Sequence, residues 1–114
     1  MYYTSENHKQ RFLEWSAPWR RNPAYEGLLY VLSCDLLASK IKTLFDFEKG
    51  QIIMDKYRVY STAEKALIRY AFTMFTDSND FDFDVRDTNI LDTRNTEVYL
   101  TANKIFLMHH GLIC

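Results

Sequence analysis

Acidic and aromatic side chains alternate in one short part of the chain, a pattern that could bind a cation or a basic surface. The residues are Asp80, Phe81, Asp82, Phe83 and Asp84. Three aspartates at alternate positions match positions 1, 3 and 5 of a calcium-binding loop. The sixth position, however, is Val85 where that loop needs glycine, and the twelfth is Leu91 where it needs a bidentate carboxylate. The sequence therefore predicts no calcium site, and we expect no metal and no cofactor.

These aspartates belong to a longer acidic segment, residues 77–92, in which six aspartates are accompanied by a single basic residue, Arg86. If the segment is extended, successive side chains point to opposite sides, so the carboxylates can face solvent while the two phenylalanines pack inward. Concentrated negative charge attracts a basic partner and accelerates encounter. We therefore predict a partner-binding surface, to which Phe81 or Phe83 adds an anchor; the alternative is a solvated loop. The carboxylates of this surface belong to Asp80, Asp82, Asp84 and Asp87.

Tryptophan and arginine, the residue types that most often dominate binding energy at interfaces, cluster around Pro18. The cluster consists of Trp15, Trp19, Arg20 and Arg21. Each member has a structural alternative, because a tryptophan can fill the core and an arginine can pair with a nearby carboxylate. We expect the core role for Trp15 but not for Trp19. Trp19, Arg20 and Arg21 therefore form a second candidate partner-binding set.

The histidines and cysteines give little sign of catalysis. His109 and His110 are adjacent, and neighbouring side chains on a helix point about 100° apart, so this pair does not suit one metal ion. His109 falls on an apolar helix face, which predicts a buried, hydrogen-bonded histidine, and Cys34 lies in an apolar run, which predicts an inert thiol. The chain also lacks the GxSxG, HExxH, P-loop and paired CxxC motifs. We therefore predict a non-enzymatic protein with no catalytic residues.

Length and charge narrow the class of protein further. A chain of 114 residues predicts a single helical domain over residues 1–114. Its 14 basic and 15 acidic residues give a net charge of −1, without the positive excess that displaces counterions from nucleic acid, so direct nucleic-acid binding is not expected. The longest apolar run, residues 27–32, is too short to cross a membrane, and the N-terminal residues show no apolar targeting segment. We expect a cytoplasmic protein.

Apolar periodicity and capping residues predict the elements that position these side chains. The serine-to-glutamate spacing that begins at Ser61 is that of a capping box, and Asn22 before Pro23 marks another helix start. The helix after Pro23 is apolar nearly all round, and Gly27 in it allows a neighbouring element to approach closely. The stretch near residues 51–60 fits a strand, a hairpin arm or an extended connector. The sequence thus predicts an all-α fold, a compact bundle of four to five helices, with one short β element as an open alternative. The expected helices run from residue 4 or 5 to 15, from 23 to 32, from a cap at 33 or 35 to about 45, from a cap at 61 onward, and from between 92 and 95 to 111.

The last expected helix carries apolar residues on two faces. One face, with Val98, Ala102 and Phe106, suits the core, whereas Leu100 and Leu107 lie on the opposite side. The helix is therefore either sandwiched between other elements or exposes a second apolar stripe, and an exposed stripe favours association. Leu100 and Leu107 are the candidate homodimer interface, and the sequence leaves monomer and homodimer open.

Several stretches of the chain form a combined pattern: Asn7 to Lys9 with Phe12, residues 28–33 and 42–47, Ser61, residues 65–67, and Ala71 with Phe72. This pattern resembles an uncharacterised family of short proteins, a domain of unknown function found in Gram-positive bacteria and their phages and mobile elements. The resemblance covers most of the chain up to about Phe75, and again residues 91–92 and 95–105. It carries no catalytic residue, and the stretch 77–94 departs from the aromatic, proline-bearing loop that the family resemblance implies there.

Absence of a catalytic set, the acidic segment and this resemblance together predict a small binding protein of phage or mobile-element type. We expect it to bind and modulate or inhibit a host protein with a basic surface, such as a nucleic-acid-binding effector. A counter-defence inhibitor of the anti-CRISPR kind is the specific form of this hypothesis, by analogy of size and charge. The alternative is a homodimeric structural or regulatory scaffold protein.

Overall fold

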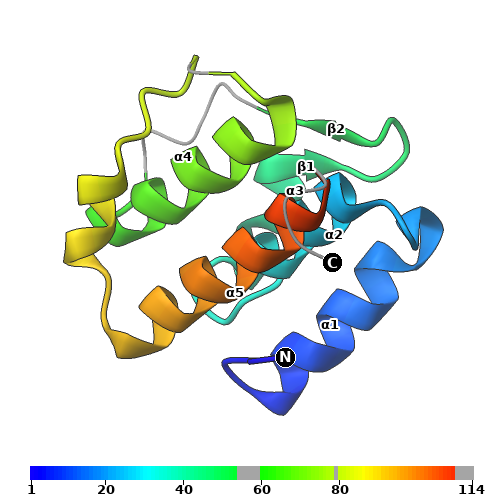
Figure 1. Ribbon diagram of the computed structural model, residues 1–114. Helices are drawn as coiled ribbons and strands as arrows, with labels where there is room; N and C mark the ends of the chain where they lie inside the picture. Colours follow the sequence, from blue (N-terminus) through cyan, green and yellow to red (C-terminus); the bar gives the residue numbers. More distant parts are fainter. Residues whose placement is uncertain (54–59, 79, 110–114) are drawn as a thin grey trace.

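The second helix, α2 (Pro23–Leu32), lies at the centre of the computed structural model (Figure 1), which describes residues 1–53, 60–78 and 80–109, the last two by their backbone alone. The Asn22 side chain accepts a hydrogen bond from the Tyr25 N–H (3.5 Å), and Pro23 occupies the first turn, where its missing N–H is harmless. Every residue from 27 to 32 is buried. A helix without a polar face must be covered on all sides, and α2 is contacted by three other helices.

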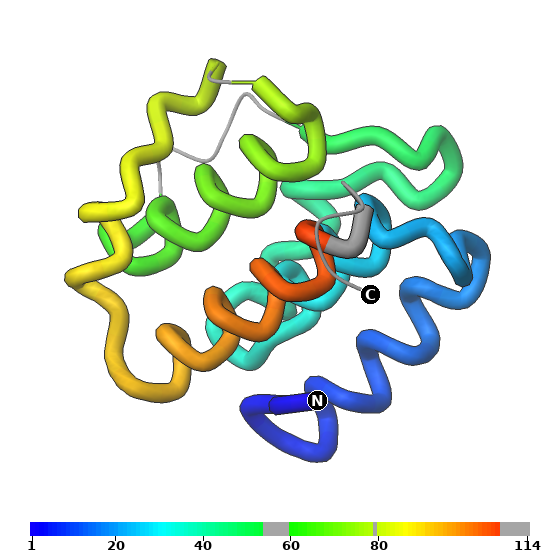
Figure 2. The backbone as a smooth tube through the Cα atoms, in the orientation of Figure 1, coloured from blue at the N-terminus to red at the C-terminus, as the bar shows by residue number. Residues whose placement is uncertain are grey.

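The three helices around α2 begin where the sequence predicts. They are α1 (Glu6–Ser16), α4 (Thr62–Thr76) and α5 (Thr93–His109). Ser5 caps α1 by accepting a hydrogen bond from the His8 N–H (3.1 Å). Ser61 and Glu64 form the expected capping box at α4, with both reciprocal hydrogen bonds present. In the backbone tube of Figure 2, α5 crosses the middle of the view, between α4 and α1. The all-α prediction is confirmed.

The expected helix over residues 33–45 is wrong for most of its length. The chain forms short elements there, and they lead into a β-hairpin. These elements are η2 (Ala38–Lys40), α3 (Ile41–Leu44), β1 (Phe45–Asp46) and β2 (Gln51–Ile52). The two strands pair antiparallel, with Phe45 opposite Ile52. The β element expected near residues 51–60 therefore starts at Gln51, and residues 54–59 lie outside the described part of the chain.

Turn chemistry explains why a hairpin replaces the helix. Oδ1 of Asp46 accepts hydrogen bonds from the backbone N–H groups of Glu48 (3.0 Å) and Lys49 (3.1 Å), and Gly50 has a φ of +63°. An aspartate that bonds its own backbone, followed by a glycine at positive φ, favours a tight turn over a continuing helix. Leu44 is buried in this arrangement, as it would be in a helix, so apolar spacing alone does not separate the two.

Helix α5 packs against α2 at Gly27, as the sequence predicts. A Cβ atom at Gly27 would lie 2.7 Å from Cε1 and Cζ of Phe106, which is closer than carbon atoms approach in proteins. Asp92 starts α5, because its Oδ1 accepts a hydrogen bond from the Asn95 N–H (2.9 Å). The expected end of this helix at Gly111 lies beyond the described residues.

A buried histidine ties the N-terminal residues to the core. The His8 ring is fully buried, and its Nδ1 accepts a hydrogen bond from the Thr4 N–H (2.9 Å). Because Nδ1 is the acceptor, Nε2 carries the proton and donates it to the Tyr30 carbonyl (2.9 Å). This arrangement fits only the neutral ring, and burial lowers the pKa of His8 below its usual value.

Candidate protein-binding site

The acidic segment runs along the outer side of α4. It begins at Asp77, which ends α4 in a left-handed conformation with a φ of +54°. Its second half forms a short helix that was not expected, η4 (Val85–Ile90), and η4 packs on α4. Figure 1 shows η4 in yellow at the left edge of the fold, whereas the segment begins at the end of α4 that is drawn beside the β-hairpin.

The phenylalanines of this segment pack inward. Phe81 is only 5% exposed, and its ring meets the edge of Phe72 at a centroid distance of 5.4 Å. Phe83 is half-buried and lies 5.4 Å from the ring of Tyr70. The predicted inward packing is therefore confirmed. The Phe81 ring is already packed in the core of this protein, and of the two candidate anchors only Phe83 keeps an accessible part.

Two of the candidate aspartates hold the backbone of η4. Oδ1 of Asp84 accepts hydrogen bonds from the backbone N–H of Arg86 (2.8 Å) and from its Nε (3.2 Å), while Oδ2 accepts one from its Nη2 (2.9 Å). Oδ2 of Asp87 accepts a hydrogen bond from the Asp84 N–H (3.0 Å), which completes a capping box. Hydrogen bonds from Arg86 lower the pKa of Asp84 to about 2. Both carboxylates therefore have a structural role.

Asp80 and Asp82 are the candidate aspartates whose charge is free for a partner. Both are exposed, and neither carboxylate has a hydrogen-bond or ion-pair partner among residues 1–53, 60–78 and 80–109. Asp82 has a φ of +54°, which aspartate tolerates better than most residues. Asp80 and Asp82 flank the buried ring of Phe81, and Asp82 is followed by the half-buried Phe83. We call Asp80 and Asp82 the acidic tip.

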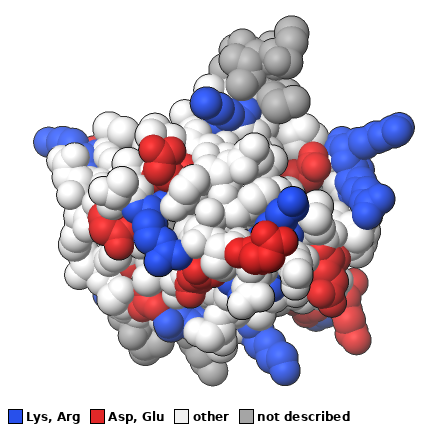
Figure 3. Space-filling model, turned by 90° about the horizontal axis from the view of Figure 1, so that it is seen from below, with Lys and Arg blue, Asp and Glu red and all other residues white. Residues whose placement is uncertain are grey.

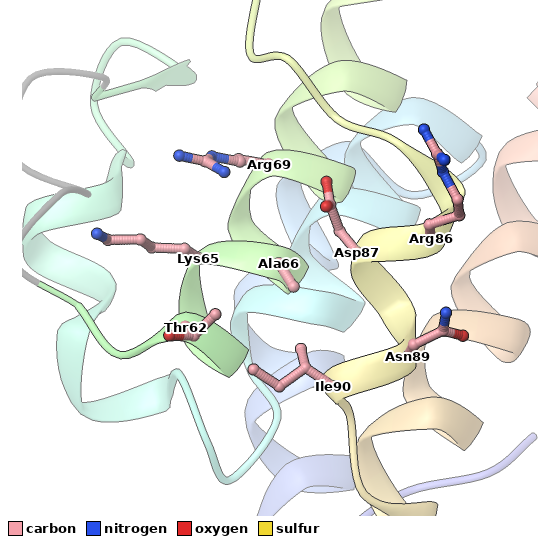
Figure 4. Close-up of a pocket in the computed structure, with 8 residues that line it drawn as sticks. All are labelled: Thr62, Lys65, Ala66, Arg69, Arg86, Asp87, Asn89 and Ile90. Atoms are coloured by element: carbon pink, nitrogen blue, oxygen red, sulfur yellow. The ribbon is translucent and has the colours of Figure 1, made fainter.

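A pocket of about 360 Å³ separates η4 from α4 beside this tip. Figure 4 shows Asp87 pointing from η4 toward α4, while the side chains of Lys65 and Arg69 extend from α4 away from η4. The pocket mixes three cations with one carboxylate, so it is not an acidic surface. Its lining residues are Thr62, Lys65, Ala66, Arg69, Arg86, Asp87, Asn89 and Ile90.

The second candidate set lies elsewhere, at the short helix η1 (Ala17–Trp19) and the hairpin. The Trp19 ring stacks on Tyr25 at 4.8 Å and 7° and meets Phe45 edge-on at 5.6 Å. Trp19 is therefore half-buried in an aromatic cluster, against the expectation that it would stay outside the core. Arg20 and Arg21 are exposed, and neither forms an ion pair with any residue that the structure describes.

Phe47, a residue not expected at this site, extends the cluster to the surface. Phe47 is 40% exposed and contacts Trp15 (5.9 Å) and Trp19 (6.4 Å). The alternation of Phe45 and Phe47 on either side of Asp46 is the signal that could have revealed a strand there. Figure 1 places the hairpin and η4 on opposite sides of the fold, so the aromatic cluster at the hairpin and the η4 half of the acidic segment do not form one site.

The candidate dimer residues lie on the outer side of α5. Leu100 is 46% exposed and Leu107 is half-buried, whereas Val98, Ala102 and Phe106 are buried against the core. The helix is therefore not sandwiched, and it exposes a second stripe of side chains that is part apolar.

Other chemistry finds little support in the described part of the chain. Burial raises the pKa of the Cys34 thiol to about 11, so this cysteine is a poor nucleophile. No three His, Cys, Asp or Glu side chains within the described ranges lie close enough to hold a metal ion, and none of the described helices is long and apolar enough to span a membrane. On the face in Figure 3, acidic and basic side chains are interspersed, without the continuous positive stripe typical of nucleic-acid binders.

Comparison with known proteins identifies the family. No curated protein and no solved structure matches the chain. The model of a family of unknown function, DUF6075, matches residues 1–111, which confirms the resemblance to an uncharacterised family. Because this match covers nearly the whole sequence, the chain belongs to that family of unknown function.

Proposed function

We propose that this protein is a non-enzymatic binding protein whose acidic tip docks on a basic surface of a host protein. The observation that supports this most directly is that the aspartates of one segment differ in their roles. Asp84 and Asp87 are used as caps, while Asp80 and Asp82 expose carboxylates with no partner in the described structure. A surface that served only to connect α4 and α5 would not need these charges.

The way the tip is held also suits binding. Phe81 in the core, Phe83 on Tyr70 and the capping box of η4 fix the backbone on both sides of Asp82. A loop that is ordered before it binds loses less conformational entropy on association. The tip therefore presents its charge at a low entropic cost.

A nucleic-acid-binding effector is the partner class that this chemistry fits best. The basic groove of such a protein attracts phosphates, and closely spaced carboxylates compete for the same groups. Inhibition of a host nuclease, as by an anti-CRISPR protein, is the specific form of the proposal, together with an origin in a phage or mobile element. A cytoplasmic location follows from the same proposal.

The test replaces the charge and keeps the shape. The double variant Asp80→Asn, Asp82→Asn should bind the partner recovered from host cytosol with a several-fold lower association rate at low salt and a weaker salt dependence. The matched control is Glu14→Gln, Glu48→Gln, which removes two exposed carboxylates elsewhere. Both variants should keep the wild-type melting temperature. Equal association rates for the two variants would contradict the proposal and leave the acidic segment a solvated connection.

A homodimeric scaffold is the second candidate function. The observation that favours it is the exposure of Leu100 on a helix face that no described element covers. A homodimer is compatible with binding of a host protein through the acidic tip, because α5 and the acidic tip present different surfaces.

A further inference from the structure

One face of α5 points away from the core and carries a symmetric pattern of charge. Residues spaced by three or four positions share a helix face, so Glu97, Leu100, Thr101 and Lys104 lie together, opposite the buried Ala102 and Phe106 line. Glu97 and Lys104 are exposed, and Leu100 is 46% exposed. In Figure 1, α5 crosses the front of the fold, with no labelled helix or strand in front of it.

The two charges are placed evenly about the middle of this face. Glu97 and Lys104 are equally distant from a point between Leu100 and Thr101, and at a rise of 1.5 Å per residue they are about 10.5 Å apart. They cannot pair with each other at that separation. Neither forms an ion pair with another residue in the described ranges, whereas the neighbouring Arg94 is held by Asp35 at 3.1 Å.

We infer that the partner of this face is a second copy of the chain, packed with its α5 antiparallel to the first. A twofold axis between Leu100 and Thr101, perpendicular to both helices, brings Glu97 of each copy to Lys104 of the other, so the dimer contains two such ion pairs. A parallel arrangement would instead place each charge beside its own equivalent. Interfaces related by a twofold axis must be self-complementary, and this pattern of charges meets that requirement in the antiparallel orientation only.

The flanks of the face agree with this arrangement. The same twofold rotation places the equivalent flanks of the two α5 helices next to each other. Leu100 and Leu107 of both copies therefore meet on one side of the interface. On the other side lies a pocket of about 470 Å³, beside Met1, which is 68% exposed. In the pair of molecules, the two pockets and the two Met1 side chains face each other. Apolar side chains that are exposed in one copy are therefore covered by the other.

Charge reversal tests this inference directly. We expect wild-type protein to dimerise in sedimentation velocity between roughly 1 μM and 1 mM, the range of modest interfaces. Glu97→Lys and Lys104→Glu should each weaken dimerisation by about tenfold or more, because each converts two attractive pairs into two repulsive ones. The double variant Glu97→Lys, Lys104→Glu should restore it to within about threefold, since attraction returns with the signs exchanged.

Matched controls separate this contact from net charge. Glu14→Lys and Lys9→Glu make the same charge changes at exposed positions of α1 and should leave dimerisation unchanged. All variants should keep the wild-type melting temperature, because they lie at exposed positions. A wild type that stays monomeric over the whole range, or a double variant weaker than both single ones, would overturn the inference. Asp80→Asn, Asp82→Asn should still dimerise, so failure here is independent of the acidic tip.

Discussion

Gly27 gives the sharpest test of how the core is packed. It lies in the middle of α2, where alanine would normally stabilise a helix by about 1 kcal/mol. At this position, however, the added methyl group would meet Cε1 and Cζ of Phe106 at 2.7 Å and Cδ1 at 2.9 Å. Phe106 is fully buried, so its ring cannot swing into solvent. Gly27→Ala therefore has to push α2 and α5 apart.

The two effects have opposite signs, and their sizes decide the outcome. Overpacking a well-filled core costs about 1–3 kcal/mol, which outweighs the gain of about 1 kcal/mol in helix propensity. An overpacking cost of about 2 kcal/mol less a propensity gain of about 1 kcal/mol leaves a net loss. We therefore expect Gly27→Ala to lower the free energy of unfolding by about 1 kcal/mol. For a chain of this length that corresponds to a melting temperature lower by about 4 °C.

A double-mutant cycle followed by urea unfolding and circular dichroism checks this explanation. Leucine has no atoms where Cε1 and Cζ of Phe106 lie, so Phe106→Leu removes the closest contacts, at a cost of its own from the space it leaves. In the Phe106→Leu background, Gly27→Ala should become stabilising by up to about 1 kcal/mol. An effect of the same sign and size in both backgrounds would refute the close approach as the reason for glycine.

Three further outcomes are expected. Burial lowers the pKa of His8 below its unfolded value of about 6.5, so the stability that the neutral ring contributes is present above pH 6.5 and is lost as the pH falls. Urea unfolding at pH 7.5 and 5.5, in a His109→Gln, His110→Gln background, should show this loss. An unchanged urea midpoint would contradict it. Ser61→Ala breaks the capping box of α4 and should cost about 1 kcal/mol, measured by thermal unfolding; no loss would mean that water replaces the cap. Asp82→Gly relieves a φ of +54° and should raise the free energy of unfolding by up to about 1 kcal/mol. The same variant should associate more slowly with the partner. Unchanged stability would show that aspartate adopts this conformation without strain.

Helix starts that depend on capping residues close in sequence are predictable, whereas an element for which helix and hairpin signals compete is not. The caps at Ser5, Asn22 and Ser61 act within four residues, so the starts of three helices follow from residue types alone. Around Phe45, by contrast, apolar spacing fits a helix and turn residues fit a hairpin. The hairpin forms because Asp46 bonds its own turn and the ring of Phe45 joins an aromatic cluster with residues distant in sequence, which no local pattern reveals.

For the candidate site, the sequence predicts the direction of side chains better than their roles. Inward phenylalanines and outward aspartates follow from alternation. The division of the aspartates into caps and free charges does not, although Asp84 and Asp87 have the three-residue spacing of a capping box. The position of Asp92 before α5 is a further cap signal. Once these are assigned, the free charges reduce to the acidic tip and to Asp77, at the end of α4.

The backbone conformations of Asp77 and Asp82 bear on why these two positions carry a charge. Both have a φ of +54°, a value that glycine adopts at no cost and asparagine at little cost. Asp77 also places a carboxylate at the carbonyl end of α4, where the helix dipole disfavours negative charge. Glycine would give the same backbone path without the cost of a positive φ, and either glycine or asparagine would give it without charge. The protein thus has exposed carboxylates at two positions where folding alone favours neutral residues, as expected if their charge serves association with a basic surface.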